Sequence, residues 1–172
     1  MEKQPMNNEM LDVVDEMGKI VGRALRSTVH GDNSLLHCVV HVFVFDNEGR
    51  LLLQKRSMSK DVAPGKWDTS VGGHVDLGEA VEDALYRELK EELGITAIKP
   101  VFMYKYIHKN HYESELVHSY RCKYVGAINF NKEEIDDVRY FSVDDIRNNL
   151  QKGLFSDNFE DEFLKYCSFL SY

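Results

Sequence analysis

Apolar and β-branched residues set the pattern of the first third of the chain. The segment LDVVDEMGKIVGRAL (residues 11–25) holds two such runs around a turn candidate at residues 16–18, which predicts a β-hairpin. The runs LLHCVVHVFVF (35–45) and RLLLQKR (50–56) flank the turn-forming letters DNEG, so two more strands are expected, the first of them well buried. Sheet is therefore expected to dominate this part of the chain.

One segment has the periodicity of a helix. Residues 79–93 contain no proline or glycine, and Gly94 supplies a stop at the C-terminal end. Apolar residues recur every four positions, at Val81, Leu85, Leu89 and Leu93. An amphipathic helix is predicted here.

The other segments alternate between strand and helix patterns. A proline and a glycine predict a loop at residues 57–66, which returns to a short strand at residues 68–71. Aromatic and β-branched content predicts three further strands, within residues 97–108, 114–126 and 137–143. Ser142 is placed to cap a helix, and residues 158–170 have the pattern of a final amphipathic helix.

This order of elements indicates the fold class. Strands interleaved with helices, after opening hairpins, are typical of an α/β or α+β domain with a mixed sheet. A chain of 172 residues, 43% of them hydrophobic, has the size and composition of one compact domain. We therefore expect a single domain at residues 11–172 after a polar tail at residues 1–10.

Charge and cysteine content narrow the classes of partner. The chain has 21 Lys and Arg residues against 29 Asp and Glu residues, a net charge of -8, which argues against nucleic-acid and anionic-membrane partners. Three widely spaced cysteines, Cys38, Cys122 and Cys167, suggest neither a disulfide framework nor a cysteine zinc site. With no apolar signal segment, a cytoplasmic protein is expected, and its state as monomer or homodimer stays open.

The predicted helix carries an unusual acidic group. At about 100° per residue, Glu88, Glu91 and Glu92 fall on one arc that borders the stripe facing the sheet, whereas Asp83 and Lys90 lie outward. Like charges at such spacing repel, and partial burial raises their pKa values. A hard divalent cation, Mg²⁺ or Mn²⁺, would offset the repulsion between these carboxylates. It would also allow an acidic protein to bind a phosphate substrate.

These residues belong to a longer motif, GHVDLGEAVEDALYRELKEELGI (residues 73–95), which resembles a complete Nudix box. The resemblance implies an α/β/α sandwich with a mixed β-sheet, an enzyme, and hydrolysis of a diphosphate linkage in a nucleoside diphosphate derivative or similar small molecule. It also implies roles for the box residues: metal binding and catalysis by Glu88, Glu91 and Glu92, support of loop and helix by Arg87 and Glu79, and a backbone position beside the metal for Gly73.

Outside the box, the chain resembles the isopentenyl diphosphate isomerase branch of the same superfamily. The residues that carry this likeness are LRSTVHGDNSLLH (25–37), RSMSKDVAPGKWDTSVGGH (56–74) and YESELV (112–117). The resemblance implies a second set of metal ligands at His30, His37, His74, Glu113 and Glu115. Glu113 and Glu115, two apart in an expected strand, would point to one face, and mixed ligands of this kind suit Mn²⁺ or Zn²⁺ as well as Mg²⁺.

One position departs from the isomerase pattern. The isomerases place a catalytic cysteine directly before the glycine-histidine pair, and this chain has Gly72 there, which has no side chain to exchange a proton. The intact box and this glycine both favour hydrolysis by water, with Glu115 or Glu113 as an additional ligand or general base. An isomerase-like enzyme and a non-catalytic sensor of a diphosphate ligand remain alternatives. Substrate choice is expected to reside in loops at residues 57–66 and 106–112.

Overall fold

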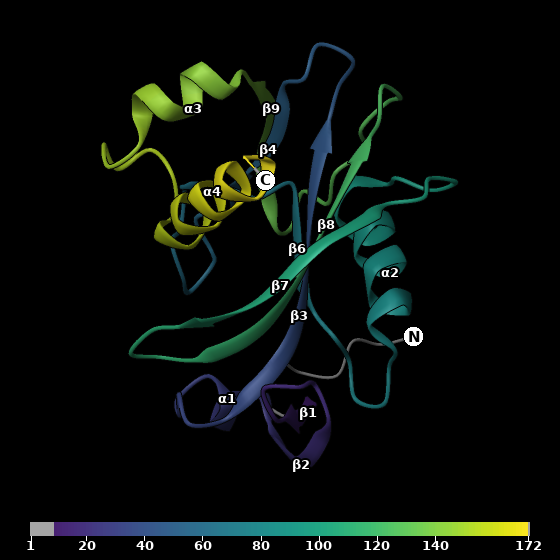
Figure 1. The fold of residues 1–172 in the computed structure, drawn as a ribbon, viewed down its shortest axis with the longest axis vertical. Coiled ribbons are helices and arrows are strands. Elements are labelled where there is room, and N and C mark those ends of the chain that lie inside the picture. The colour runs from purple at the N-terminus through teal and green to yellow at the C-terminus, as the bar shows by residue number, and fades with distance from the viewer. Residues whose placement is uncertain (1–8, 172) are drawn as a thin grey trace.

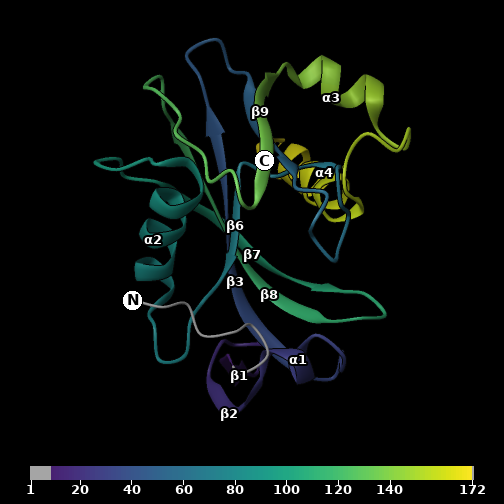
Figure 2. The ribbon, with the colours of Figure 1, turned by 180° about the vertical axis from the view of Figure 1, so that it is seen from behind.

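The computed structural model describes residues 9–171, which form a nine-stranded mixed sheet with helices on both faces (Figures 1 and 2). The strands are β1 (Met10–Val14), β2 (Ile20–Leu25), β3 (Leu36–Phe45), β4 (Leu51–Arg56), β5 (Trp67–Asp68), β6 (Val71–His74), β7 (Val101–Lys109), β8 (Ser114–Lys123) and β9 (Ile135–Phe141). The helices are α1 (Arg26–Val29), α2 (Val81–Leu93), α3 (Val143–Asn149) and α4 (Asp157–Leu170). This architecture confirms the expected α/β class.

Strand β3 is the centre of the sheet. It pairs in parallel with β8 along its whole length and antiparallel with β6, where His41 lies opposite Gly72 and Val39 opposite His74. On the far side of β8, β7 continues the sheet as an antiparallel hairpin. A parallel pair at the centre with antiparallel neighbours makes the sheet mixed, as the sequence predicts.

The two faces of the sheet form separate apolar cores. On one face, alternate residues of β3 pack with α2 in a cluster that includes Val40, Val42, Val44, Leu85 and Leu89. On the other face, a largely aromatic cluster joins the sheet to α3 and α4 and includes Phe43, Ile146, Phe155, Phe159 and Phe163. Because β3 alternates, its residues His37 and His41 share the α4 side with Phe43.

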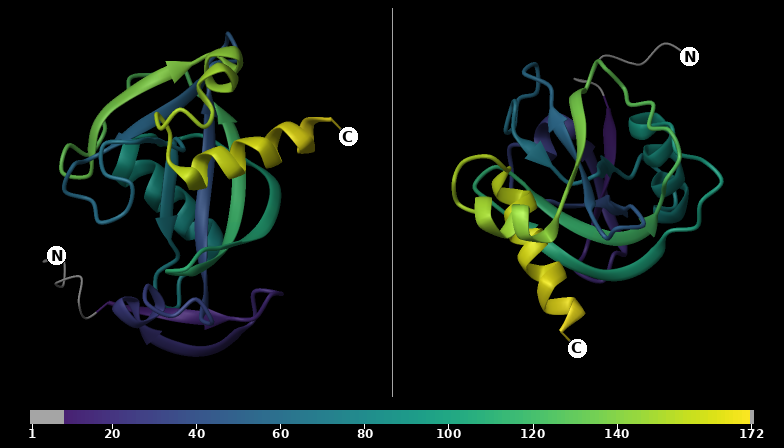
Figure 3. Two further views of the ribbon diagram at one scale, coloured as in Figure 1. Left: turned by 90° about the vertical axis from the view of Figure 1, so that its left-hand side faces the viewer. Right: turned by 90° about the horizontal axis from the view of Figure 1, so that it is seen from above.

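The N-terminal hairpin forms as predicted. Strands β1 and β2 pair from Met10 opposite Leu25 to Val14 opposite Ile20, around a turn at Gly18. A single bridge from Val13 to His37 attaches the hairpin to the sheet of its own chain, at the lower end of β3 in Figure 3. Most of the expected polar tail, residues 1–8, lies outside the described residues, and β1 already begins at Met10.

Two boundary predictions are wrong. The single strand expected at residues 68–71 is in fact two strands, because the chain leaves β4 after β5 and joins β3 as β6, with Thr69 and Ser70 in between. The loop expected at residues 106–112 is half strand, because β7 stays paired with β8 as far as Lys109. The β7–β8 turn is short, since the side chain of Asn110 accepts hydrogen bonds from the backbone N–H groups of Tyr112 and Glu113.

The helix predictions agree more closely with the structure. Helix α2 begins at Val81, two residues later than expected, so Glu79 belongs to the preceding loop, and Gly94 ends the helix in a left-handed conformation. Ser142 caps α3 by accepting the Asp145 N–H, as predicted. No helix within residues 9–171 combines the length and apolar character needed to cross a membrane.

Candidate metal and substrate site

The acidic residues of α2 differ in their surroundings. Glu92 is 8% exposed, and its Oε2 accepts hydrogen bonds from Gln54 Nε2 at 2.9 Å and from the Gly72 N–H at 3.2 Å. Glu88 lies partly buried against β6, whereas the Glu91 side chain is 52% exposed. The structure therefore turns Glu88 and Glu92 toward the sheet and leaves Glu91 at the rim.

Arg87 connects the helix to the loop before it. Its guanidinium group donates to both carboxylate oxygens of Glu79 at 2.9 Å, to Glu88 at 2.6 Å and to the backbone oxygen of His74 at 2.9 Å. Glu79 in turn accepts the Asp76 N–H at 2.9 Å. A forked, permanently charged donor suits this arrangement, and it holds the Glu88 carboxylate beside strand β6.

Gly73 lies directly under this carboxylate. A side chain at position 73 would overlap the carboxyl group of Glu88, so the close approach of α2 to β6 depends on glycine. The backbone of Gly73 thus borders the carboxylates, where the resemblance to the Nudix box also places it.

Glu88 and Glu92 resist ionisation in this environment. Burial raises the pKa of Glu88 to about 7, and burial together with the charge of Glu88 raises the pKa of Glu92 to about 8. A bound cation would favour their charged forms. The potential metal ligands of Glu88, Glu91 and Glu92 are all carboxylate oxygens, and Glu91 is open to solvent. These residues therefore fit a hard ion such as Mg²⁺.

A second cluster lies at the lower end of β3. The side chains of His30, His37, His74 and Glu113 converge so that one potential ligand atom from each lies within 4.8 Å of all the others. His30 Nε2 is 2.9 Å from His74 Nε2 and 3.4 Å from Glu113 Oε2. Four chain segments contribute one residue each: the C-terminal cap of α1, β3, β6 and the β7–β8 turn.

The histidines of this cluster are held neutral. Burial and the neighbouring His30 lower the pKa of His37 to about 3, and burial lowers the pKa of His74 well below its ordinary value. Both ring nitrogens of His37 are buried without a hydrogen-bond partner among residues 9–171. Neutral imidazoles that face a carboxylate, one of them with both nitrogens unpaired, fit a divalent cation, Mn²⁺ or Zn²⁺ as readily as Mg²⁺.

The two glutamates of the expected set lie differently. Glu113 stands in the turn just before β8 and joins the histidines, whereas Glu115 in β8 is 4.0 Å from His37 Nε2. Burial and the charge of Glu113 raise the pKa of Glu115 to about 7. Glu115 Oε2 is buried without a partner in the described part of the chain. Glu115 is therefore beside the cluster rather than within it.

Cations near these clusters were not identified from the sequence. Arg26 and Arg56 lower the pKa of Glu113 against the larger effect of burial, and Lys60 adds to the positive potential at His74. Lys60 also forms an ion pair of 2.8 Å with Glu134, a carboxylate close enough to raise the pKa values of Glu88 and Glu92. An isolated arginine or lysine in a loop carries no local signal, so only the fold reveals this grouping.

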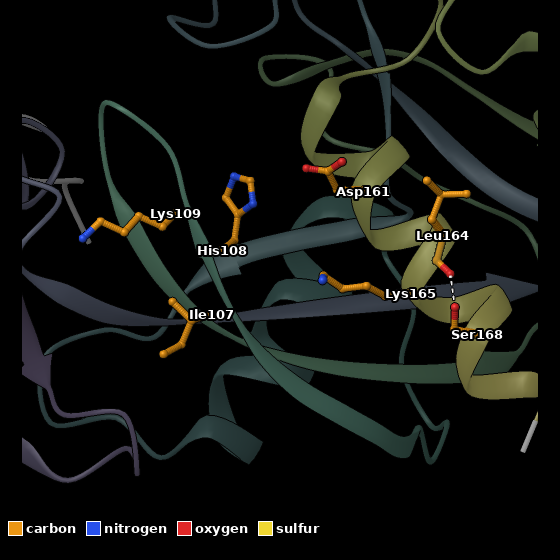
Figure 4. Close-up of a pocket in the computed structure, with 7 residues that line it drawn as sticks. All are labelled: Ile107, His108, Lys109, Asp161, Leu164, Lys165 and Ser168. Carbon is orange, nitrogen blue, oxygen red and sulfur yellow. Dashed lines mark hydrogen bonds between the residues drawn. The ribbon is translucent and has the colours of Figure 1, made fainter.

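Three basic residues within the expected substrate loop at residues 106–112 lie away from both clusters. His108 and Lys109 stand on β7 rather than in a loop, and they line a surface pocket of about 620 Å³ between β7 and α4 (Figure 4). Asp161, Lys165 and Ser168 of α4 line its other side. His111 is exposed in the β7–β8 turn. The pocket opens on the α4 face of the sheet, away from helix α2.

Comparison with known proteins agrees with this geometry. The sequence profile of the NUDIX domain family matches residues 35–163. An isopentenyl-diphosphate Delta-isomerase from Salmonella arizonae is 33% identical over 82% of this chain and 81% of its own length. An uncharacterized Nudix hydrolase from Clostridium acetobutylicum is 34% identical over 90% of this chain and 81% of its own.

Solved structures share the fold. A protein from Deinococcus radiodurans named DR0079 matches with a TM-score of 0.80 and 25% identity, covering 91% of this chain and 98% of that one. The NUDIX domain of Shewanella oneidensis NrtR, solved with ADP ribose, matches with a TM-score of 0.63 and 15% identity over 78% of this chain and 88% of that one. With the family profile spanning most of the sequence, this chain belongs to the Nudix family.

Proposed function

We propose that this protein is a divalent-metal-dependent hydrolase that cleaves a diphosphate linkage by attack of water. The observation that carries the proposal is the pair of carboxylates of Glu88, partly buried, and Glu92, buried, which α2 holds against the glycine backbone of β6. A cation bound here would favour the ionised carboxylates, and a cation is what an acidic protein needs to hold a diphosphate.

The residues take distinct roles in this proposal. Glu88, Glu91 and Glu92 would hold Mg²⁺, or Mn²⁺, which when bound polarises phosphoryl oxygens and lowers the pKa of water. Arg87 and Glu79 keep the loop and helix in register, and Gln54 and the Gly72 N–H orient Glu92.

Glu115 is the candidate general base. Burial and Glu113 raise its pKa to about 7, which lets it accept a proton near neutral pH, and its Oε2 is unpaired among the described residues. The histidine cluster beside it would hold a second cation.

A nucleoside diphosphate derivative is the substrate class that we favour. The Shewanella domain with the same fold was solved with ADP ribose, which is such a compound. Arg26, Arg56 and Lys60, grouped about the two clusters, supply positive charge for the diphosphate. The loop at residues 57–66, which contains Lys60, would contribute to the choice of substrate.

An isomerase of isopentenyl diphosphate is the second candidate, because relatives carry that name and four of the five expected ligands, His30, His37, His74 and Glu113, converge. Gly72 argues against an isomerase. A side-chain carbon there would stand 3.2 Å from His41 Cδ2 and 3.4 Å from His41 Nε2, so a thiol has little room beside the glycine backbone. A sensor that binds a diphosphate without cleaving it is the third candidate. The intact acidic face of α2 favours a catalyst over such a sensor.

We also propose a cytoplasmic location, where the free cysteines Cys38, Cys122 and Cys167 stay reduced. The net charge of -8 supports small anionic substrates held through metal rather than nucleic-acid or membrane partners. Both a monomer and a homodimer agree with this proposal.

The test is an activity panel. Nucleoside diphosphate derivatives and isopentenyl diphosphate are incubated with and without Mg²⁺ or Mn²⁺, and phosphate-bearing products are measured. Glu92→Gln, which keeps the side-chain size, should reduce kcat at least about 100-fold. Glu82→Gln, an exposed position on the same helix, is the matched control and should retain activity. Activity of Glu92→Gln within a few-fold of wild type would overturn the assignment.

A further inference from the structure

A separate group of buried polar side chains lies on the α4 side of the sheet. Glu162 of α4 is fully buried, accepts a hydrogen bond from Ser119 Oγ at 2.5 Å and pairs with His41 Nδ1 at 2.5 Å. Burial opposes protonation of His41, but the Glu162 carboxylate outweighs it and raises the pKa of His41 to about 9. His41 is therefore an imidazolium at neutral pH, and it faces the Glu162 carboxyl group.

Buried hydroxyl groups surround this pair. The phenolic oxygens of Tyr104 and Tyr106 and the hydroxyl of Thr69 are buried and form no well-aligned hydrogen bond among residues 9–171, with Tyr104 facing Ser119 and Tyr106 facing Glu162. Buried polar groups in folded proteins are normally paired, and a buried ion pair contributes little to stability compared with apolar residues. Packing alone therefore does not explain why polar groups gather here.

The pair reaches the surface through one edge of the His41 ring. Glu162 is fully enclosed, whereas 9% of the His41 side chain is exposed. Gly72 lies opposite His41 in the sheet, and because it has no side chain, the Cδ2–Nε2 edge of the ring is left uncovered beside it. With Nδ1 bonded to Glu162, the Nε2–H group is the donor that faces outward.

This edge lies on the same face of the sheet as the histidine cluster, whereas Glu88 and Glu92 lie across β6 on the α2 face. The N–H of Gly72 donates to Glu92, and the neighbouring Gly73 contacts Glu88. His41 is also four residues along β3 from His37 on the same face, a separation of about 13 Å. A diphosphate held at the histidine cluster would therefore direct its attached group along β3 toward His41.

A surface pocket lies beyond Tyr106. Lys165 of α4 lies 5.1 Å from the ring centre of Tyr106 and also lines the pocket between β7 and α4 (Figure 4). In that view, His108 and Lys165 lie on facing elements, β7 and α4. The His41 Nε2–H group, the tyrosine hydroxyls and Lys165 can all donate hydrogen bonds, so they suit a ligand that offers acceptor oxygens or nitrogens.

We propose that the His41–Glu162 pair, with Tyr104 and Tyr106, is the recognition site for the group attached to the diphosphate, and that this group carries hydrogen-bond acceptors rather than an alkenyl chain. A sugar ring and a nucleobase share this chemistry. The inference rests on the proposed hydrolase function and deepens it, because it names the part of the protein that selects the substrate.

The experiment compares selectivity in wild type and in His41→Leu/Glu162→Met. This double substitution removes both charges together and so avoids an unpaired buried ion. ADP-ribose, 5-phosphoribosyl diphosphate and isopentenyl diphosphate serve as substrates, with Mg²⁺. Wild type should prefer an acceptor-bearing substrate, and the variant should lose at least about 10-fold of that kcat/KM ratio against isopentenyl diphosphate. The second compound, which has a sugar but no base, separates the two sources of acceptors.

The outcomes are distinguishable. If wild type cleaves nothing in the panel, the proposed function fails; if it cleaves them but the variant keeps the same ratio, or wild type prefers isopentenyl diphosphate, this inference fails alone. Should the variant not fold, nitrogen NMR of histidine-labelled wild type replaces it. A non-hydrolysable ADP-ribose analogue should shift the His41 Nε2 signal, and methylenediphosphonate should not; equal effects of the two would overturn the inference.

Discussion

The carboxyl group of Glu88 occupies the space that a side chain at Gly73 would need. The contact joins α2 to β6 at the point where the acidic residues meet the sheet. There is no room for a methyl group at position 73 unless Glu88 moves. Since the obstructing atoms are at the end of a flexible side chain, a substitution at 73 would move the carboxylate rather than break the fold.

Gly73→Ala should therefore inactivate the protein without unfolding it. We expect kcat/KM to fall at least about 100-fold, because a misplaced carboxylate loses its geometry with metal and substrate. Gly22→Ala is the control, since a methyl group on that strand meets no atom within 4 Å. Kinetics and thermal unfolding are measured together, and a loss of activity that only parallels a loss of folded protein would contradict the account.

Metal-free protein should become less stable as the pH rises. The folded-state pKa values of Glu88 and Glu92, about 7 and about 8, lie above those of unfolded glutamate, so the folded protein binds more protons between roughly pH 4.5 and 8. Their contribution to stability is complete below the unfolded pKa and is lost as the pH rises through the folded values.

Glu92→Gln mimics the neutral acid and should remove part of this dependence. With a chelator present, we expect the variant to exceed wild type by at least about 1 kcal/mol in free energy of unfolding at pH 8.5 and to differ little at pH 5. Urea unfolding at the two pH values measures this, with Glu82→Gln as control. An equal slope with pH in wild type and Glu92→Gln would show that Glu92 ionises freely.

The histidine cluster should bind a divalent cation of its own. His37→Gln removes the ligand with two unpaired ring nitrogens, and we expect it to bind one fewer equivalent of Zn²⁺ or Mn²⁺ than wild type. His111→Gln, at an exposed position, should bind like wild type. Titration calorimetry counts the equivalents; an unchanged count in His37→Gln would remove this site from the account.

The buried pair should show the asymmetry expected of two coupled charges. Glu162→Leu leaves the His41 charge unpaired and should cost about 3 to 5 kcal/mol, whereas His41→Leu/Glu162→Leu should cost less. Because the folded pKa of His41, about 9, exceeds its unfolded value, its contribution is complete below about pH 6.5 and is lost as the pH rises through 9. Urea unfolding at pH 7 and pH 10 tests both statements, and a double variant no more stable than Glu162→Leu contradicts the first.

Local signals in the sequence predict part of this structure well. Helix α2, the cap at Ser142 and the N-terminal hairpin depend on neighbours within a few residues, so periodicity and turn residues suffice to find them. The acidic face of α2 follows from the helical repeat in the same way.

The features that the sequence does not predict depend on contacts between residues far apart in the chain. The break between β5 and β6 exists because one segment serves two different partner strands, and β7 is longer than expected because β8 extends it. His41 and Glu162 are 121 residues apart, one in an apolar strand and the other in an amphipathic helix whose acidic residues read as solvent-facing. No local pattern indicates that they meet.

The most direct test of the central claim follows the oxygen of water. The reaction is run with Mg²⁺ in water labelled with ¹⁸O, on the best substrate of the panel, and the products are examined by mass spectrometry. The account predicts one labelled oxygen in a phosphate-bearing product for each bond cleaved, and none when Glu92→Gln replaces wild type. An intact, unlabelled diphosphate that exchanges hydrogen with solvent would contradict it and would favour an isomerase.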